Sequence, residues 1–187
     1  RGNVSCQGPR ACYDESKRVG ETLSDIYFNY KGLYTNTIRP FNIYGPGMQE
    51  TDYRVLPNFA SQIKRNLPLN IYGSGNQTRT FCYITDAIIG FLLVILKGKG
   101  GEAYNIGNSG PEISIIDLAK ILKEVSFKNV EYKITEYPST YPEDEPNRRL
   151  PDISKALEDL SFKPKISLRE GLKRFLNWSE LYYSSDK

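Results

Sequence analysis

Tyr13 and Lys17 are the two residues whose types and spacing best fit acid–base chemistry. Because they are four residues apart, they lie on one face if the segment is helical. An ammonium group beside a phenol stabilises the phenolate and lowers a tyrosine pKa from about 10 toward neutral pH, as a general base requires. The exposed face of an ordinary amphipathic helix explains the same spacing, so the pattern by itself leaves both interpretations open.

Two arginines are candidates for binding anionic groups. Arg79 follows a glycine-rich turn, and Arg149 lies in the proline-rich segment 138–151. A guanidinium group binds phosphate or carboxylate oxygens at two points, so these residues fit a diphosphate and a carboxylate. A surface ion pair is the alternative for each, and the adjacent Arg148 leaves the choice between the two neighbours open.

The composition excludes several other kinds of chemistry. The 187 residues contain no histidine, which rules out Ser-His-Asp and Cys-His nucleophiles and histidine-ligated zinc. Three cysteines without Cys-x-x-Cys spacing indicate neither a disulfide framework nor a metal site and favour a cytoplasmic protein. A net charge of +3, from 25 basic and 22 acidic residues, is too small to indicate nucleic acid or a membrane as partner.

Alternating helices and strands must position these residues. Helices are predicted over about 9–30, 54–64, 87–96, 153–160 and 168–182, with a further one from Ser114, and strands over 35–39, 69–72, 80–84, 103–106 and 130–134. Thr85 and Asp86 are expected to cap the apolar helix, which is about half as long as a membrane span. The pattern predicts an α/β protein whose five short strands are too few for a complete doubly wound sheet.

Five blocks of sequence carry a resemblance to a known superfamily. The first block, around Tyr13, resembles the catalytic helix of the extended short-chain dehydrogenase/reductases that act on nucleotide sugars. The blocks, which follow that superfamily's order, are Gly8-Pro-Arg-Ala-Cys-Tyr-Asp-Glu-Ser-Lys-Arg18, Arg39-Pro-Phe-Asn-Ile-Tyr-Gly-Pro46, Ile71-Tyr-Gly-Ser-Gly-Asn-Gln-Thr-Arg-Thr-Phe81, Tyr104-Asn-Ile-Gly-Asn108 and Arg148-Arg-Leu-Pro-Asp-Ile-Ser-Lys155.

Within the superfamily, the sequence is most similar to UDP-glucuronate decarboxylases. Gly2-Asn-Val4 and the spacing from Tyr13 to Arg54 fit that family, and Arg79-Thr-Phe81 stands where dehydratases carry Arg-Asp-Trp. Ser16, Gly47 and Gln49 depart from the decarboxylase pattern. Nucleotide-sugar 4-epimerases and 4,6-dehydratases therefore stay as alternatives, and a catalytically incomplete sugar-nucleotide-binding fragment is an alternative of another class.

The resemblance implies roles for individual residues. Tyr13 would be the catalytic base, while Lys17 would act in catalysis and, with Tyr13 and Arg54, contact the NAD cofactor. Arg149 would serve in both catalysis and substrate binding. The substrate, a UDP-sugar, would be contacted by Asn42, Tyr27, Tyr72, Arg79 and Arg149.

For three of these residues and for Asp86, a structural role is the alternative. Tyr27 and Tyr72 would then pack in a core, and Asn42 would cap the turn at Gly45. Asp86 is expected to cap a helix and not to act in catalysis.

The resemblance also implies the fold and its division. We expect the C-terminal part of a doubly wound, Rossmann-like parallel sheet together with a smaller α/β substrate-binding domain. Residues 1–46 would form the tail of the NAD-binding domain, and residues 47–187 would mainly form the nucleotide-sugar-binding region, with short returns to the sheet at about 80–98. No Gly-x-Gly-x-x-Gly follows a strand, so the N-terminal NAD-binding half is expected to be missing and the fragment alone inactive. When full length, the protein is expected to form a homodimer.

Overall fold

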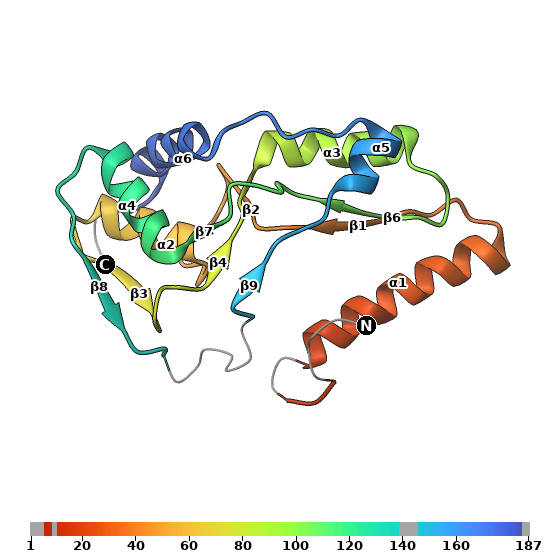
Figure 1. Cartoon of the computed structure of the whole chain (residues 1–187), viewed down its shortest axis with the longest axis horizontal. Coiled ribbons are helices and arrows are strands. Elements are labelled where there is room, and N and C mark those ends of the chain that lie inside the picture. The colour runs from red at the N-terminus through yellow and green to blue at the C-terminus, as the bar shows by residue number, and fades with distance from the viewer. Residues whose placement is uncertain (1–5, 9–10, 139–145, 185–187) are drawn as a thin grey trace.

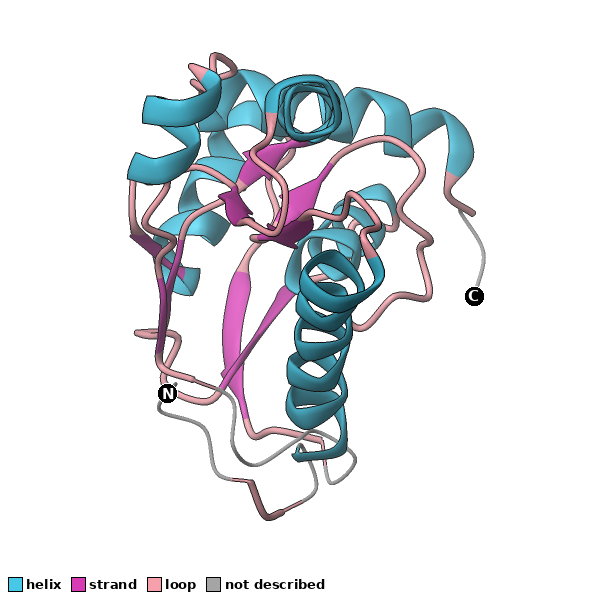
Figure 2. Ribbon diagram, turned by 90° about the vertical axis from the view of Figure 1, so that its right-hand side faces the viewer, coloured by secondary structure: helices cyan, strands magenta, loops and turns pink. Residues whose placement is uncertain are grey.

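The structure, a computed structural model, describes residues 6–8, 11–138 and 146–184. Its helices and strands form two parts that lie side by side (Figure 1). We call them the ribbon region, built on a two-stranded ribbon, and the cavity lobe, built around three packed helices. Figure 2 shows strands lying between helices, as in a layered α/β protein.

The ribbon region is a parallel pair of strands with helices on both faces. Strand β1 (Thr37–Pro40) pairs in parallel with β6 (Ala103–Ile106), and Ile38 lies opposite Tyr104. Helix α1 (Ala11–Lys31) lies on one face, whereas α3 (Ile84–Lys97) and the short α5 (Ser154–Leu160) lie on the other (Figure 1). Parallel strands with helices on both faces are the arrangement of doubly wound α/β folds.

The cavity lobe packs helices against a second parallel pair. Helices α2 (Val55–Lys64), α4 (Ile115–Ser126) and α6 (Leu168–Tyr182) gather beside β3 (Leu69–Tyr72) and β8 (Tyr132–Thr135). Ser114 and Ser167 cap α4 and α6 by accepting hydrogen bonds from the third residue that follows each of them. The predicted cap at Ser114 is therefore confirmed, and α6 has the predicted bounds.

Short strands join the two parts. Strand β2 (Ile43–Tyr44) pairs in parallel with β5 (Cys82–Tyr83). A three-stranded sheet has the order β7 (Ile113–Ser114), β4 (Thr78–Arg79), β9 (Arg148–Arg149), with β7 antiparallel and β9 parallel to β4. The described residues thus contain nine strands instead of the five predicted, because most have only two residues and leave too little alternation to be seen in the sequence.

The predicted strand over 80–84 and the predicted cap of the next helix are wrong in detail. The backbone changes partners after Arg79, so β4 and β5 belong to different sheets. Helix α3 begins at Ile84 after the N-cap residue Tyr83, which makes no side-chain capping bond. Asp86 is buried, and its Oδ2 accepts hydrogen bonds from the backbone nitrogens of Lys165 (3.0 Å) and Ile166 (2.8 Å). Asp86 therefore fixes a distant loop instead of capping its own helix.

Most of the hydrophobic core lies in the cavity lobe. The largest buried side chains there include Phe59, Leu69, Ile71, Leu118, Leu122, Leu172 and Phe175. The core of the ribbon region is smaller and consists of Val94, Tyr104, Ile106, Ala156, Leu160 and Phe162. In the described part of the chain, no helix is both long enough and apolar enough to cross a membrane.

Candidate active site

A cavity of about 440 Å³ opens where the cavity lobe meets the start of α1. Its walls come from α1, α2, β3 and the three-stranded sheet, together with the loop before α2. Among the predicted site residues, the cavity is lined by Tyr13, Asn42, Arg54, Tyr72, Arg79 and Arg149. Lys17 and Tyr27 are not among its lining residues. Segments as far apart in the sequence as Tyr13 and Arg149 thus contribute to one site.

Arg79 and Arg149 lie side by side in the cavity wall. They are register partners on the parallel strands β4 and β9. Arg79 is only 7% exposed, and its Nη1 donates to the backbone oxygens of Thr78 (2.8 Å) and Asn147 (3.2 Å). Arg79 is therefore not the surface side chain of the alternative interpretation. Two adjacent guanidinium groups in one cavity wall offer several hydrogen-bond donors of the kind that binds phosphate or carboxylate oxygens.

The structure separates Arg149 from its neighbour Arg148. The guanidinium of Arg148 binds Glu112, with Nε 2.9 Å from Oε1 and Nη2 2.9 Å from Oε2. Arg148 is not a lining residue of the cavity, whereas Arg149 is. Because successive side chains of a strand point to opposite faces, the engagement of Arg148 on the outer face directs Arg149 inward. Of the two neighbours, Arg149 is the one placed to meet a ligand.

Tyr13 and Lys17 are neighbours on α1. Lys17 Nζ lies 5.3 Å from the centre of the Tyr13 ring, and Ser16 Oγ donates to the Tyr13 backbone oxygen at 2.7 Å. Tyr13 is 57% exposed and forms part of the cavity wall. The predicted spacing on one helical face is thus confirmed, and only the tyrosine of the pair reaches the cavity.

Tyr27 is neither buried nor at the cavity, whereas Asn42 lines the cavity without capping the following turn. Tyr27 is 48% exposed, and α1 buries none of its residues, so Tyr27 is not a core residue of the described structure. Asn42 does not cap the following turn: its Nδ2 donates to the backbone oxygen of Thr80 at 2.7 Å. Its own backbone oxygen accepts a hydrogen bond from Cys82 N at 3.2 Å. Asn42 therefore holds the segment between β4 and β5 against the cavity.

Arg54 stands at the cavity wall with Asp52 as its partner. Its Nε donates to Asp52 Oδ2 at 2.8 Å, and its Nη2 contacts the same oxygen. The hydrogen bond from Arg54 lowers the pKa of Asp52 below its usual range, and the same contact raises the pKa of Arg54. The pair keeps one charge of each sign beside the loop that leads into α2.

Several lining residues escaped the sequence analysis. Tyr137 follows β8 and places its ring 6.1 Å from that of Tyr72, and Gln77 Nε2 donates to the Tyr72 backbone oxygen at 3.1 Å. Gly73 makes room for Tyr137, because a Cβ there would lie 2.5 Å from the Tyr137 ring. The pairing of β3 with β8 joins segments about sixty residues apart, so no local pattern could have indicated this contact. The remaining polar residues that were missed are Tyr44, Tyr53, Asn58 and Asn70.

Relatives of known name match most of this chain. UDP-glucuronic acid decarboxylase 1 of Arabidopsis thaliana is 43% identical over 178 residues, which are 94% of this chain and 39% of the relative. UDP-glucuronic acid decarboxylase 6 of the same plant is 44% identical over 171 residues, or 91% of this chain and 48% of the relative. The chain therefore spans less than half the length of these relatives.

Solved structures match the fold as well. UDP-glucuronic acid 4-epimerase from Bacillus cereus, solved with UDP-glucuronic acid and NAD, superposes with a TM-score of 0.82 and 30% identity over 98% of this chain and 58% of that one. Epimerase Mth375 from Methanothermobacter thermautotrophicus gives a TM-score of 0.83 and 30% identity over 94% of this chain and 52% of that one. These similarities confirm the predicted Rossmann-like α/β class.

A family model covers more than half of the sequence. It is described as the NAD dependent epimerase/dehydratase family, and it matches residues 2–107. This range includes Tyr13, Lys17, Asn42, Arg54, Tyr72 and Arg79. The chain belongs to the NAD dependent epimerase/dehydratase family.

Proposed function

We propose that the protein carrying this sequence decarboxylates UDP-glucuronate to UDP-xylose with NAD. One observation carries the proposal: a single cavity brings Tyr13, a phenol fit for proton transfer, together with the paired arginines Arg79 and Arg149. UDP-glucuronate offers a hydroxyl for the phenol and two anionic groups, a diphosphate and a carboxylate, for the arginines. The 43% identity to a UDP-glucuronic acid decarboxylase supports the same substrate.

The cavity residues divide the substrate among them. Arg79, in the more buried position, would bind the diphosphate, and Arg149 would hold the sugar carboxylate. Tyr72 and Tyr137 offer aromatic faces for the base. Both arginines can contribute two hydrogen bonds to one anion, so they would orient the sugar as well as bind it.

Tyr13 would begin the reaction by removing the proton of the sugar C4 hydroxyl. Lys17, 5.3 Å from the ring centre, stabilises the negative charge of the phenolate. When bound, NAD accepts a hydride from C4 and later returns it, so the reaction has no net redox change. The oxidised sugar has a carbonyl β to its carboxylate, and the bond to the carboxylate breaks with its electron pair passing into the carbonyl as an enolate. Release of CO₂, reprotonation of the enolate and reduction at C4 then give the pentose.

The described residues fit one end of a dinucleotide. Tyr13 and Lys17 are exposed side by side on α1, where a ribose could reach both, and Arg54 lies at the same cavity. The sequence contains no Gly-x-Gly-x-x-Gly after a strand, which is the usual cradle of the pyrophosphate. We therefore propose that these 187 residues bind NAD too weakly for turnover on their own.

We also propose the division into a cofactor-side segment, 1–46, and a mainly substrate-binding segment, 47–187, that returns at about 80–98. Supporting it, α1 and β1 belong to the ribbon region, α2 and β3 belong to the cavity lobe, and α3 packs back on the ribbon, to which β6 and α5 also return. A homodimer is proposed through α1, whose exposed apolar side chains recur at helical spacing. These are Val19, Leu23, Ile26 and Tyr30.

A 4-epimerase acting on the same sugar nucleotide is the second candidate function. The chain's likeness to the Bacillus cereus UDP-glucuronic acid 4-epimerase favours it, and both reactions start with oxidation at C4. Incubation of the protein that carries this sequence with UDP-glucuronate and NAD separates the two. Decarboxylation releases CO₂ and UDP-xylose, whereas UDP-galacturonate without CO₂ would replace the proposed function by epimerisation.

Replacing Tyr13 tests the proton transfer. Tyr13→Phe removes only the hydroxyl, so turnover of UDP-glucuronate is expected to fall by about 10²- to 10⁴-fold while the affinity for UDP changes less than about twofold. Tyr182→Phe is the matched control, because Tyr182 is 68% exposed on α6 and does not line the cavity. Full turnover by Tyr13→Phe would refute the assignment of the base.

A further inference from the structure

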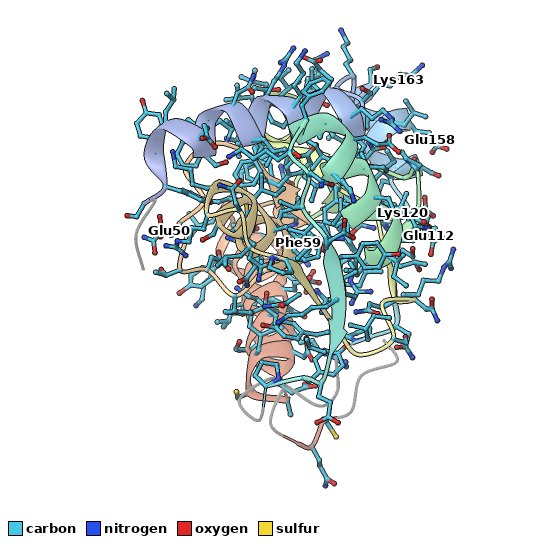
Figure 3. All side chains as sticks on the ribbon, turned by 90° about the vertical axis from the view of Figure 1, so that its left-hand side faces the viewer. Glu50, Phe59, Glu112, Lys120, Glu158 and Lys163 are labelled. Atoms are coloured by element: carbon cyan, nitrogen blue, oxygen red, sulfur yellow. The ribbon has the colours of Figure 1, made fainter. Side chains whose placement is uncertain are left out.

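Glu112 connects the three strands of the sheet that contains the cavity arginines. It directly precedes β7, and its carboxylate accepts two hydrogen bonds from Arg148 of β9, each 2.9 Å long. The hydroxyl of Thr78 on β4 donates to Glu112 Oε1 at 2.5 Å. The Glu112 side chain is 26% exposed, and Figure 3 shows Glu112 at the edge of this face of the molecule, away from Phe59. One carboxylate thus contacts β4 and β9 from the end of β7.

The register of the sheet connects this outer contact to the cavity. Thr78 lies opposite Arg148, and in the next register position Arg79 lies opposite Arg149. Because side chains alternate between the two faces of a strand, the first pair faces Glu112 and the second pair faces the cavity. Fixing the outer pair therefore fixes the direction of the inner pair.

The strands need such a contact because they are short. Strands β4, β7 and β9 have two residues each and form few backbone hydrogen bonds. A carboxylate that binds one strand through a two-point ion pair and the other through a hydroxyl therefore strengthens the pairing of β4 with β9.

The charge of Glu112 is maintained by the same contacts. Hydrogen bonds from Arg148 and Thr78 lower the pKa of Glu112 below its usual range, so the side chain is ionised at neutral pH. Arg148 binds Glu112 on the outer face of the sheet, whereas Arg79 and Arg149 line the cavity.

We propose that Glu112 is a positioning residue that holds Arg79 and Arg149 in the geometry required to bind the anionic groups of a nucleoside-diphosphate ligand. The inference rests on the proposed function for the identity of the ligand. Glu112 does not line the cavity and would affect ligand binding by fixing the strand pair β4–β9. The substitution of Glu112 is therefore expected to weaken recognition of phosphate groups and to leave recognition of the nucleoside unaffected.

The test is to titrate UDP and uridine into the chain and into Glu112→Gln, followed by NMR chemical shifts. The dissociation constant of UDP is expected to rise about fivefold to tenfold, which corresponds to loss of one coupling between neighbouring groups. The dissociation constant of uridine is expected to change less than about twofold. A loss of fold would weaken both ligands alike, so this split distinguishes positioning from a merely structural role.

Three further variants complete the experiment. Arg148→Met removes the contact from the other partner and should reproduce the UDP-specific loss, whereas the exchange Glu112→Arg with Arg148→Glu should restore most of the affinity. Glu124→Gln is the matched control, since it breaks the exposed ion pair with Arg169 (2.6 Å) between α4 and α6, outside the cavity.

Each contrary outcome identifies what has failed. Equal UDP affinity in the unaltered chain, Glu112→Gln and Arg148→Met would overturn the positioning role. Equal losses for UDP and uridine would also overturn it. If the unaltered chain binds no UDP, the proposed function fails, and the role of Glu112 fails with it.

Discussion

The cavity lobe and the ribbon region differ in how fully each buries its own apolar side chains. In the lobe, α2, α4 and α6 enclose a core that includes the fully buried Phe175. In the ribbon region, α1 buries no residue, and the outward side chains of α3 remain 49–76% exposed. These are Ile88, Ile89, Leu92, Ile95 and Leu96.

The two sides of the candidate site are therefore held in place to different extents. One side carries the two arginines, and the other carries Tyr13. The arginine side lies next to the lobe core, because Phe81, two residues after β4, belongs to that core. Tyr13 is carried by α1, which is attached to the rest through few contacts. One is the ion pair of Glu21 with Arg39, and another is the hydrogen bond from Thr35 Oγ1 to the Ser24 backbone oxygen at 2.8 Å. We expect anion binding to be a property of the lobe and proton transfer to depend on how firmly α1 is held.

The largest expected effect is the difference in stability loss between two substitutions, one of an apolar side chain in the cavity lobe and one in the ribbon region. Phe175→Ala leaves a cavity in the lobe core and is expected to lower the free energy of unfolding by about 3–5 kcal/mol. Leu96→Gln replaces a side chain that is 76% exposed and is expected to change the free energy of unfolding by less than about 0.5 kcal/mol. Urea denaturation measures both. A cost above about 2 kcal/mol for Leu96→Gln would show that the outer face of α3 is covered and would remove the contrast between the two parts.

A smaller effect is expected from pH on the attachment of α1. Hydrogen bonds from Arg39 lower the pKa of Glu21 in the folded chain. A carboxyl with a depressed folded pKa stabilises the fold above its unfolded pKa, and this contribution is lost as the pH falls through the folded value. Protection of the α1 amides from hydrogen exchange, corrected for intrinsic rates, should therefore decrease about twofold to fivefold as the pH falls below about 4.3.

Arg39→Gln provides the control for this prediction. It removes the partner of Glu21, so the protection of α1 should already be reduced at neutral pH and the step near the titration of Glu21 should disappear. An unchanged pH profile in Arg39→Gln would mean that other carboxylates control the attachment of α1.

Helices with clear apolar periodicity were predictable from the sequence. The predicted range of α6 agrees with Leu168–Tyr182, and α2 begins one residue after the predicted start. Apolar residues at helical spacing leave few alternatives for such segments. The role of Asp86 was not predictable, because its partners Lys165 and Ile166 lie about eighty residues away.

Parts of the candidate site that lie within one helix were predictable from the sequence. Parts that depend on which strands pair, and therefore on which way a side chain points, were not. The spacing of Tyr13 and Lys17 on one helical face follows from helix geometry alone. The choice between Arg148 and Arg149 depends on which of them points to the outer face of the sheet, where Glu112 lies. Only the pairing of β9 with β4 determines this. Tyr137 was missed for the same reason, since it meets Tyr72 through the pairing of β8 with β3.

The most direct test of the central claim is a calorimetric titration of UDP-glucuronate into this chain and into Arg79→Gln. In the proposed function Arg79 would supply charge-assisted hydrogen bonds worth about 1.5–3 kcal/mol, so the variant is expected to bind about tenfold to a hundredfold more weakly while circular dichroism shows an unchanged fold. Arg169→Gln, on the outside of α6, should bind like the unaltered chain. Equal dissociation constants for the unaltered chain and Arg79→Gln would contradict the assignment of this cavity to a nucleotide sugar.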